Sequence, residues 1–316
     1  MAVHEGAAER RIAPSDRQLT YVPGRFGRYW VLVRRYPLGA VGAAFVLILI
    51  AMATAPGLFT PFPGQDPLVQ DVYSRFQGPS LSHWFGTDDL GRDVYARIVF
   101  AARTAIVIGF GTVIVAKVVA VTMGTISAFY SGWFDTIFQR FVDMAAALPG
   151  LVFIILAVTI LAPRLPSLPF VQSDIIAIIL AVSLLNSVNS SRTIRGVALS
   201  IREEQFIEAV RSLGGSDRRI VFRHMVPNLF GVVLVSSSLL VGTAVLIESS
   251  LSFLGYGVSP PAPSWGRMIS DSREYMTRAP HLAIFPGLWI FLTVWSFNML
   301  GDALRDHLDP RMRGAR

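Results

Sequence analysis

The chain has 316 residues, of which 53% are hydrophobic and only 16% charged, and this balance favours a membrane protein over a soluble domain. No cysteine is present, which excludes disulfides, thiol catalysis and cysteine-ligated zinc. The net charge of +7 does not indicate nucleic-acid binding, because the arginines are spread along the ends of apolar segments rather than gathered on one face.

Residues 1–36 are polar and rich in arginine, and we expect them to remain attached as an N-terminal tail. Six apolar runs follow, each long enough for the roughly 20 residues that a membrane-spanning helix needs. The predicted spans are 37–59, 99–129, 137–162, 174–191, 229–254 and 281–301. The sequence therefore predicts an all-α integral membrane protein with about six transmembrane helices.

The segment 60–98, between the first two spans, contains the polar stretch GTDDLGRDV (86–94). Its alternating charges can pair within one helical turn or cap a short helix. We interpret the stretch as an amphipathic helix lying at the membrane interface. A metal site built from its carboxylates is the less favoured alternative.

Lys117 is the only lysine of the chain and stands near the middle of the second span. A phosphate-binding P-loop needs Gly-Lys-Ser/Thr, whereas Lys117 lies in VIVAKVVAV, so the chain cannot bind ATP by that motif. Ionisable residues inside a membrane usually face the bundle interior or a cavity. Lys117 can therefore line a translocation path, pair with an acid of a partner protein or extend toward the interface.

Further polar side chains lie in or near the later spans. Arg140 and Asp143 are three residues apart and predict a local ion pair. Asn186, Asn189 and Asn298 place amides within or at the ends of apolar helices, where hydrogen bonding between helices is the commoner use. A polar path for peptide backbones is the alternative role of these amides.

The longest charged loop, before the fifth span, contains two short helical patterns. QFIEAVRSL (205–213) predicts a helix that Gly214 and Gly215 end, because glycine adopts left-handed dihedrals at little cost. Ser216 is the expected N-cap of a second helix, DRRIVFRHM, that ends before Pro227. A glycine corner with apolar and small residues suits insertion into a groove of a partner protein. An ordinary solvated loop is the alternative.

The remaining motifs do not support a filter, a metal site or a catalytic site. GYG (255–257) lacks the preceding Thr-Val and pore helix of a potassium filter. The histidines lack the spacing of metal ligands or of a catalytic triad, and they stand at His4, His83, His224, His281 and His307. We predict neither catalytic residues nor a metal site in this chain.

Arginine counting predicts the orientation. With the N-terminus inside, the cytoplasmic segments hold 18 basic residues and the external segments hold 7. The positive-inside rule then places both termini and the loop 192–228 in the cytoplasm.

Several stretches resemble the permeases of ABC importers. The pattern of the family's EAA loop is matched by Glu208, Ala209, Gly214 and Pro227, whereas Val210 replaces the third alanine and His224 and Val226 replace a hydrophobic residue and a leucine. The ending HMVPN, the stretch 83–104, the stretch 248–274 and the C-terminal FNMLGDALRDHLDPRMR are similar to the C-type subunit of the peptide and nickel branch. The resemblance covers about residues 30–313.

The resemblance implies a type I importer permease. It implies a first span at 37–59, a core of five helices at 99–301 with a cytoplasmic coupling loop at 192–228 and an external loop at 255–280, and a cytoplasmic tail at 302–316. The residues implied in coupling to an ATPase are Glu208, Ala209, Val210, Arg211, Gly214, His224 and Pro227. Glu248 stands where the family commonly has glutamate, so we expect a shared structural role, with a place on the translocation path as the alternative.

The implied partners are a homologous second permease, two ATPase subunits and an extracytoplasmic substrate-binding protein in a prokaryotic cytoplasmic membrane. ATP and Mg²⁺ would bind to the ATPases, and no cofactor is expected in this chain. We therefore predict a non-enzymatic subunit that moves peptides or related small solutes by alternating access. An importer of nickel or another non-peptide solute is the first alternative, and a channel or secondary transporter that needs no ATPase is the second.

Overall fold

The computed structural model describes residues 33–60, 66–168 and 171–308, and the chain divides into two compact units, Met1–Pro37 and Leu38–Arg316. In the first unit, the described residues include one helical turn at 33–35, and the Arg35 guanidinium lies 5.5 Å from the centre of the Tyr36 ring. Most of the expected N-terminal tail and residues 309–316 of the expected C-terminal tail lie outside the described residues.

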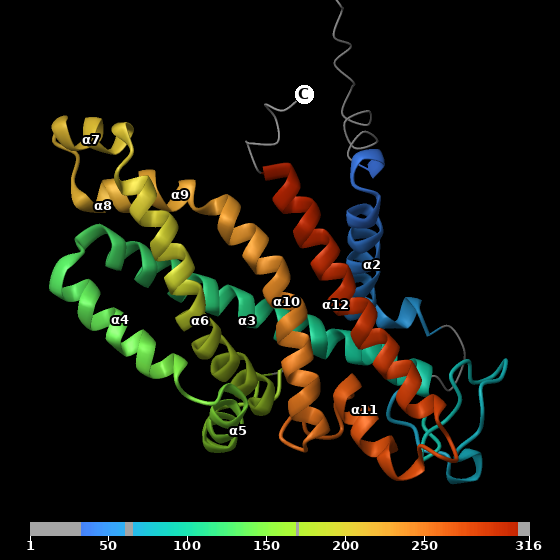
Figure 1. Ribbon diagram of the computed structural model, residues 1–316. Helices are drawn as coiled ribbons and strands as arrows, with labels where there is room; N and C mark the ends of the chain where they lie inside the picture. Colours follow the sequence, from blue (N-terminus) through green and yellow to red (C-terminus); the bar gives the residue numbers. More distant parts are fainter. Residues whose placement is uncertain (1–32, 61–65, 169–170, 309–316) are drawn as a thin grey trace, which may run out of the picture. The chain divides into compact units, whose positions relative to one another are not determined.

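The described part of the second unit is built from helices, with no β-strand (Figure 1). The long helices are α2 (Pro37–Thr54), α3 (Val94–Tyr130), α4 (Gly132–Ala146), α5 (Gly150–Leu161), α6 (Ser173–Arg202), α10 (Phe230–Phe253) and α12 (His281–Leu308). The short helices are α7 (Gln205–Ser212), α8 (Asp217–Arg219), α9 (Val226–Asn228) and α11 (Trp265–Ser272). Single turns lie at Pro56–Leu58, Val72–Ser74, Ala162–Arg164 and Arg273–Tyr275, and a π-helix spans Ile220–Met225.

Five helices, α2, α3, α6, α10 and α12, are long and apolar enough to cross a membrane. A sixth span exists only if α4 and α5 are taken together, and these two helices meet at a 91° bend. The predicted continuous span 137–162 is therefore wrong in its geometry. Pro149 stands at the bend and lacks the amide hydrogen that an unbroken helix would use there.

Several predicted boundaries also differ. The stretch 86–93 forms turns rather than the expected amphipathic helix, and α3 begins at Val94. The fourth predicted span was too short, because α6 continues to Arg202. The loop 255–280, which was expected to be external, contains the short helix α11, which was not predicted.

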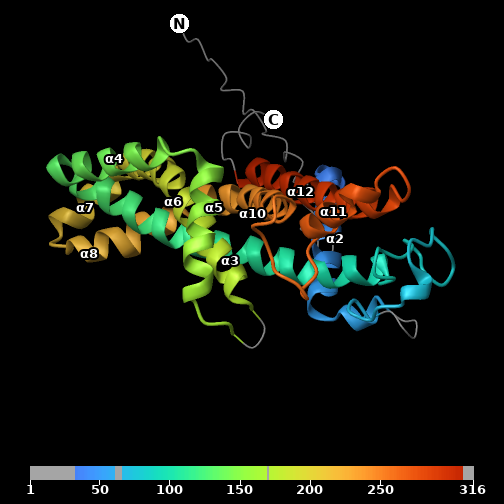
Figure 2. The ribbon, with the colours of Figure 1, turned by 90° about the horizontal axis from the view of Figure 1, so that it is seen from below.

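Helices α3 and α6 pack along each other more extensively than any other described pair, and α10 packs against both α12 and α3 (Figures 1 and 2). Gly124 marks the close approach of α3 to α6, since a β-carbon there would lie 2.7 Å from the Ser191 carbonyl oxygen. Small residues at such contacts are typical of membrane helix pairs. The α3–α6 pair thus forms a continuous support for the segment that follows α6.

Candidate functional site

Residues 205–228, called the 205–228 segment below, form a sharp corner between α7 and the π-helix. Gly214 has a φ of +78°, which L-residues with a β-carbon rarely adopt. The Gly215 amide donates to the Val210 carbonyl at 2.9 Å, and the Gly214 amide donates to the Arg211 carbonyl at 3.0 Å. This pair of bonds is a Schellman motif, and it ends α7 at the two glycines that were predicted to end it.

The second half of the corner differs from the prediction. Ser216 has the extended backbone of an N-cap, but its hydroxyl makes no capping hydrogen bond in the described structure. The helix does not end before Pro227, because the π-helix passes directly into α9 and Pro227 is the second residue of α9. The Asn228 side-chain amide donates to the His224 carbonyl at 2.7 Å. A π-helical turn inside a helix often marks a functional position.

An apolar cluster anchors the 205–228 segment on the ends of α3 and α6. Its buried members from the segment and the next residue are Ile207, Ile220, Val221, Met225 and Leu229, and its partners are Ala128 and Phe129 of α3 and Ile194 and Ala198 of α6. Fully burying one such side chain contributes about 2 kcal/mol. The segment is therefore attached to the long helices rather than loosely tethered.

The opposite face of α7 is open. Phe206 is 41% exposed and Leu213 is 89% exposed, and the exposed Ala209 lies between them on the same helical stripe. Glu208 and Arg211 of the same helix are also exposed. A short helix with an exposed apolar stripe and exposed charges has the features of an anchor that inserts into a groove.

The structure places the predicted coupling residues on both sides of the corner. Glu208, Ala209 and Arg211 are exposed on α7, where Val210 is half-buried. His224 is half-buried and its Nε2 has no described hydrogen-bond partner, whereas Pro227 is exposed. The accessible part of the predicted set therefore consists of Glu208, Ala209, Arg211, Gly214 and Pro227.

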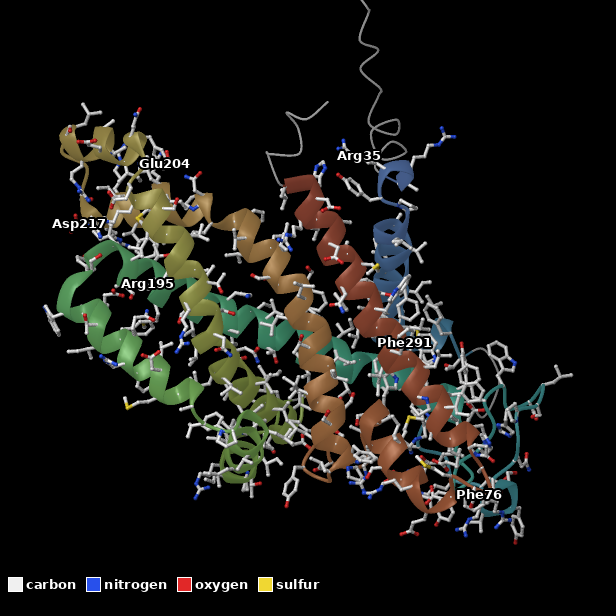
Figure 3. All side chains as sticks on the ribbon, viewed as in Figure 1. Arg35, Phe76, Arg195, Glu204, Asp217 and Phe291 are labelled. Carbon is white, nitrogen blue, oxygen red and sulfur yellow. The ribbon has the colours of Figure 1, made fainter. Side chains whose placement is uncertain are left out.

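Three arginines of α6, which we call the arginine seam, connect the part of α6 that precedes the 205–228 segment to α3 and α4. Arg195 donates through Nε and Nη2 to the two carboxylate oxygens of Asp135 on α4, at 2.6 and 2.5 Å, and the Ser127 hydroxyl of α3 donates to the same carboxylate. Arg202 donates to the Ala128 carbonyl at 3.0 Å. Figure 3 labels Arg195 on α6, and it labels Glu204 and Asp217 on either side of the corner.

The third arginine of the seam corrects a prediction. Asp143 pairs with Arg192 of α6 at 2.6 Å, not with Arg140 of its own helix. Sequence reasoning missed the seam, although a signal was present. Arg192, Arg195 and Arg202 are three and seven residues apart, which places them along one face of a helix.

The candidate path residues do not form one site. The Lys117 ammonium donates to the Ser190 hydroxyl of α6 at 3.1 Å. The Asn186 amide donates to the Val182 carbonyl of its own helix at 2.9 Å, and Asn189 is exposed. Asn298 is half-buried on α12. Lys117 and the α6 asparagines lie on the α3–α6 pair, whereas Glu248 and Asn298 lie on the α10–α12 pair.

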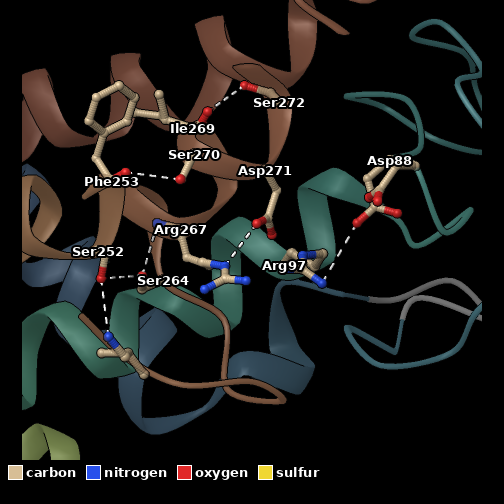
Figure 4. A network of polar contacts seen from close by, with 12 residues as sticks. Asp88, Arg97, Ser252, Phe253, Ser264, Arg267, Ile269, Ser270, Asp271 and Ser272 are labelled. Carbon is tan, nitrogen blue, oxygen red and sulfur yellow. Dashed lines mark hydrogen bonds and ion pairs between the residues drawn. The ribbon is translucent and has the colours of Figure 1, made fainter. Parts of the chain in front are cut away.

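Glu248 has a different environment, a group of serines that we call the serine network. The Glu248 side chain is buried in α10, and the Ser252 hydroxyl donates to its carboxylate at 2.6 Å. Ser264 donates to the Ser252 oxygen at 3.2 Å, which joins the loop before α11 to α10 (Figure 4). This arrangement agrees with a structural role for Glu248 and gives no support to a place on an open path.

The residues before α3 form a second polar cluster at the end of α3 opposite Tyr130. The Asp88 carboxylate accepts the Arg92 and Leu90 amides and the Arg92 Nε, and it lies 3.7 Å from Arg97 (Figure 4). The Asp93 carboxylate accepts the Ala96 amide and so caps α3. Burial and the neighbouring Asp88 carboxylate raise the pKa of Asp89. Among the described residues no group suited to holding a metal ion is found, so this cluster gives no support to the metal alternative.

Comparisons with known proteins agree with these features. Residues 120–314 match the family described as binding-protein-dependent transport system inner membrane component. The chain is 36% identical over 286 residues to the glutathione transport system permease protein GsiD of Escherichia coli O6:K15:H31, and the match covers 90% of each chain. Proteins of the same name from Shigella boydii serotype 4 and Shigella sonnei match equally well. The 205–228 segment lies inside the family match, whereas the polar cluster before α3 lies outside it.

Proposed function

The chain belongs to the family of binding-protein-dependent transport system inner membrane components, the permease subunits of ABC importers, and we propose that its 205–228 segment docks an ATP-hydrolysing partner subunit. The observation that carries the proposal is the two-sided build of α7. Ile207 faces the apolar cluster on α3 and α6, while Phe206 and Leu213 remain exposed on the other face. A partner that covered the exposed face would be held against the long helices through the buried one.

The arginine seam supplies a route for movement. The Arg195 guanidinium donates to both carboxylate oxygens of Asp135. A shift of the end of α6 therefore also acts on α4 and on the bent α4–α5 pair. Closure of two ATPase subunits on ATP and Mg²⁺ would move the docked segment and, through the seam, the membrane helices. The permease would thereby switch between outward and inward access, as a two-state element biased by its partners.

The assembly we infer contains this chain, a homologous second permease, two ATPase subunits and a binding protein on the outer side. The arginine distribution supports an orientation with the 205–228 segment and both termini in the cytoplasm. ATP hydrolysis would reside in the partner subunits, and this chain would act as a non-enzymatic part of the pathway.

The solute we propose is a small peptide or peptide-like molecule. Support comes from relatives that are 36% identical and carry the name of a glutathione transport permease. Uptake of labelled glutathione, a dipeptide and Ni²⁺ by the reconstituted complex with its binding protein tests the solute class. Uptake of Ni²⁺ alone would contradict the peptide assignment and leave the docking proposal intact.

Glu208→Arg tests the docking proposal, because it reverses an exposed charge beside the apolar stripe of α7. We expect the purified permease to keep its thermal stability, while ATPase binding and solute uptake fall about thirtyfold or more, the scale of losing an interface hot spot. Asp302→Arg, a charge reversal of an exposed residue on α12 outside the 205–228 segment, is the control and should have a much smaller effect. Normal ATPase binding and uptake in Glu208→Arg would contradict the proposal.

A further inference from the structure

Lys117 is a buried cation without an anionic partner in the described chain. Its side chain lies in α3 and only 7% of the residue is exposed. The neutral hydroxyl of Ser190 is its one hydrogen-bond partner among the described residues, and no described carboxylate lies within ion-pairing distance of Nζ. Burying an ammonium group with a single neutral partner is costly, so the site favours an anion supplied from outside the chain.

A recess of about 290 Å³ adjoins Lys117. Its walls come from α3, from the start of α10 and from the 205–228 segment, and its lining residues are Lys117, Val118, Val121, Thr122, Thr125, Ile126, Val221, Phe222, Val226 and Val233. The Thr125 hydroxyl is buried and has no described hydrogen-bond partner. The lining therefore contains one ammonium and two threonines, Thr122 and Thr125, and the rest of the recess is apolar.

The composition and size of the recess favour a particular kind of anion. Pockets for small ligands are mostly apolar, contain a few placed polar groups and begin at about 300 Å³, so this recess can hold part of a small solute. A carboxylate with an attached organic chain matches an ammonium and a hydroxyl beside apolar walls. An acidic side chain of another subunit that paired permanently with Lys117 would need the ammonium charge, but it would not need the volume of the recess.

The position of the recess connects it to the transport cycle. Val221 and Phe222 of the π-helix form part of its wall, and Val221 also belongs to the apolar cluster that anchors the 205–228 segment. A movement of that segment therefore changes the shape of the recess. A ligand held there would bind in one state of the permease and leave in the other.

We propose that the recess receives a carboxylate of the transported peptide-like solute, held by the Lys117 ammonium and the Thr125 hydroxyl. The inference rests on the proposed function, because it takes the solute class from it. It adds a binding residue inside the membrane-spanning part of the chain and predicts a preference for solutes with a free carboxylate.

The absence of any other lysine permits a direct test. The complete complex in proteoliposomes is treated with an amine-reactive acetyl ester, and acetylation of Lys117 is measured by mass spectrometry, with the N-terminal amine of the same chain as the internal control. Glutathione at saturating concentration should lower Lys117 acetylation about tenfold. Its dimethyl ester carries the same amine and thiol but no free carboxylate, and it should protect little at a concentration matched for consumption of the reagent. Equal acetylation of Lys117 in the presence of glutathione and of its dimethyl ester would overturn the proposal.

Transport by variants gives an independent test. Lys117→Met should lower uptake of glutathione about tenfold or more, the scale of a lost hydrogen bond to a charged group, while Lys117→Arg keeps part of it. Thr125→Val should give a smaller loss, and Thr159→Val is its control, because the exposed Thr159 hydroxyl bonds only its own helix at the Ile155 carbonyl. The assembled complex and its ATP hydrolysis without solute should persist in all four.

The outcomes separate this inference from the proposed function. If the unmodified complex imports no peptide-like solute, the proposed function fails. If it imports glutathione and Lys117→Met does so equally well, only the carboxylate site fails. Loss of the second permease from Lys117→Met would assign the lysine to an acid of that subunit and overturn the site. Protection of Lys117 by phosphatidylglycerol vesicles instead of glutathione would assign it to a lipid phosphate and overturn the site as well.

Discussion

The two ends of α3 are held in different ways. At the end that begins at Val94, buried hydrogen bonds add to an apolar cluster in fixing the neighbouring segments, with the Trp265 indole bonded to the Ile98 carbonyl at 3.1 Å and the Thr104 hydroxyl bonded to the Pro263 carbonyl at 3.0 Å. At the end near Tyr130, the 205–228 segment rests on an apolar cluster and carries an exposed face.

The difference fits different mechanical tasks. Directional hydrogen bonds between buried groups permit one arrangement, because a small displacement leaves polar groups unpaired. Apolar contacts are not directional and tolerate a small rotation of the segment that they hold. We conclude that the end with the serine network serves as a fixed platform, whereas the 205–228 segment is suited to move with a docked partner.

The largest expected effect comes from disturbing the platform. In Gly266→Ala, the new β-carbon would lie 2.4 Å from the Ser249 carbonyl oxygen, and backbone cannot move aside easily. We expect a loss of about 3 kcal/mol of stability, seen as a fall of about 5 °C or more in melting temperature in detergent. Gly287→Ala is the matched control, since a β-carbon there meets no atom within 4 Å. Equal melting temperatures for the two variants would show that the platform is not tightly packed.

A smaller effect is expected at the arginine seam. Arg195→Met removes both bonds to Asp135, whose side chain is only 14% exposed. We expect the free energy of unfolding to fall by about 2 kcal/mol and the ratio of solute uptake to ATP hydrolysis to fall as well. Arg192→Met breaks a pair in which both side chains are well exposed, so its effect on stability should stay below about 0.5 kcal/mol. Denaturation of both variants, together with their ratio of uptake to hydrolysis, checks this order. An unchanged ratio of uptake to hydrolysis in Arg195→Met would contradict a role of the seam in the proposed route of movement.

The effect on stability expected at the glycine corner is smaller than that of Arg195→Met. Gly214→Ala places a β-carbon at a φ of +78° and should cost about 1 kcal/mol, although open space surrounds the position. Gly214→Asn should retain more stability and more ATPase binding, because asparagine tolerates this conformation better. Identical ATPase binding by the glycine, alanine and asparagine forms would contradict a need for the left-handed corner.

The sequence predicted the features that depend on local patterns. Long apolar runs located the spanning helices, and Gly214-Gly215 located the corner, since both signals are read from neighbouring residues. The 91° bend was missed because hydrophobicity continues across Leu148 and Pro149 and does not record direction.

Partner assignments across the fold were the part that the sequence withheld. Asp143 has Arg140 as a sequence neighbour but binds Arg192, which lies 49 positions away. The sequence around Glu248 did not indicate that Ser252 donates to its carboxylate and that Ser264, on a separate segment, donates to Ser252. The exposed stripe of α7 could be foreseen as a pattern, but only the burial of Ile207 identified its inner face.

Site-directed crosslinking in native membranes tests the central claim most directly, because the chain contains no cysteine of its own. Leu213 on the 205–228 segment and Leu81 before α3 are 89% and 93% exposed and provide matched positions at the two ends. With a cysteine-linked photocrosslinker, Leu213→Cys should capture an ATPase subunit in an ATP-dependent manner, and Leu81→Cys should not, while reacting with impermeant thiol reagents from outside. An ATPase captured by Leu81→Cys, or labelling of Leu213→Cys from outside the cell, would contradict the account.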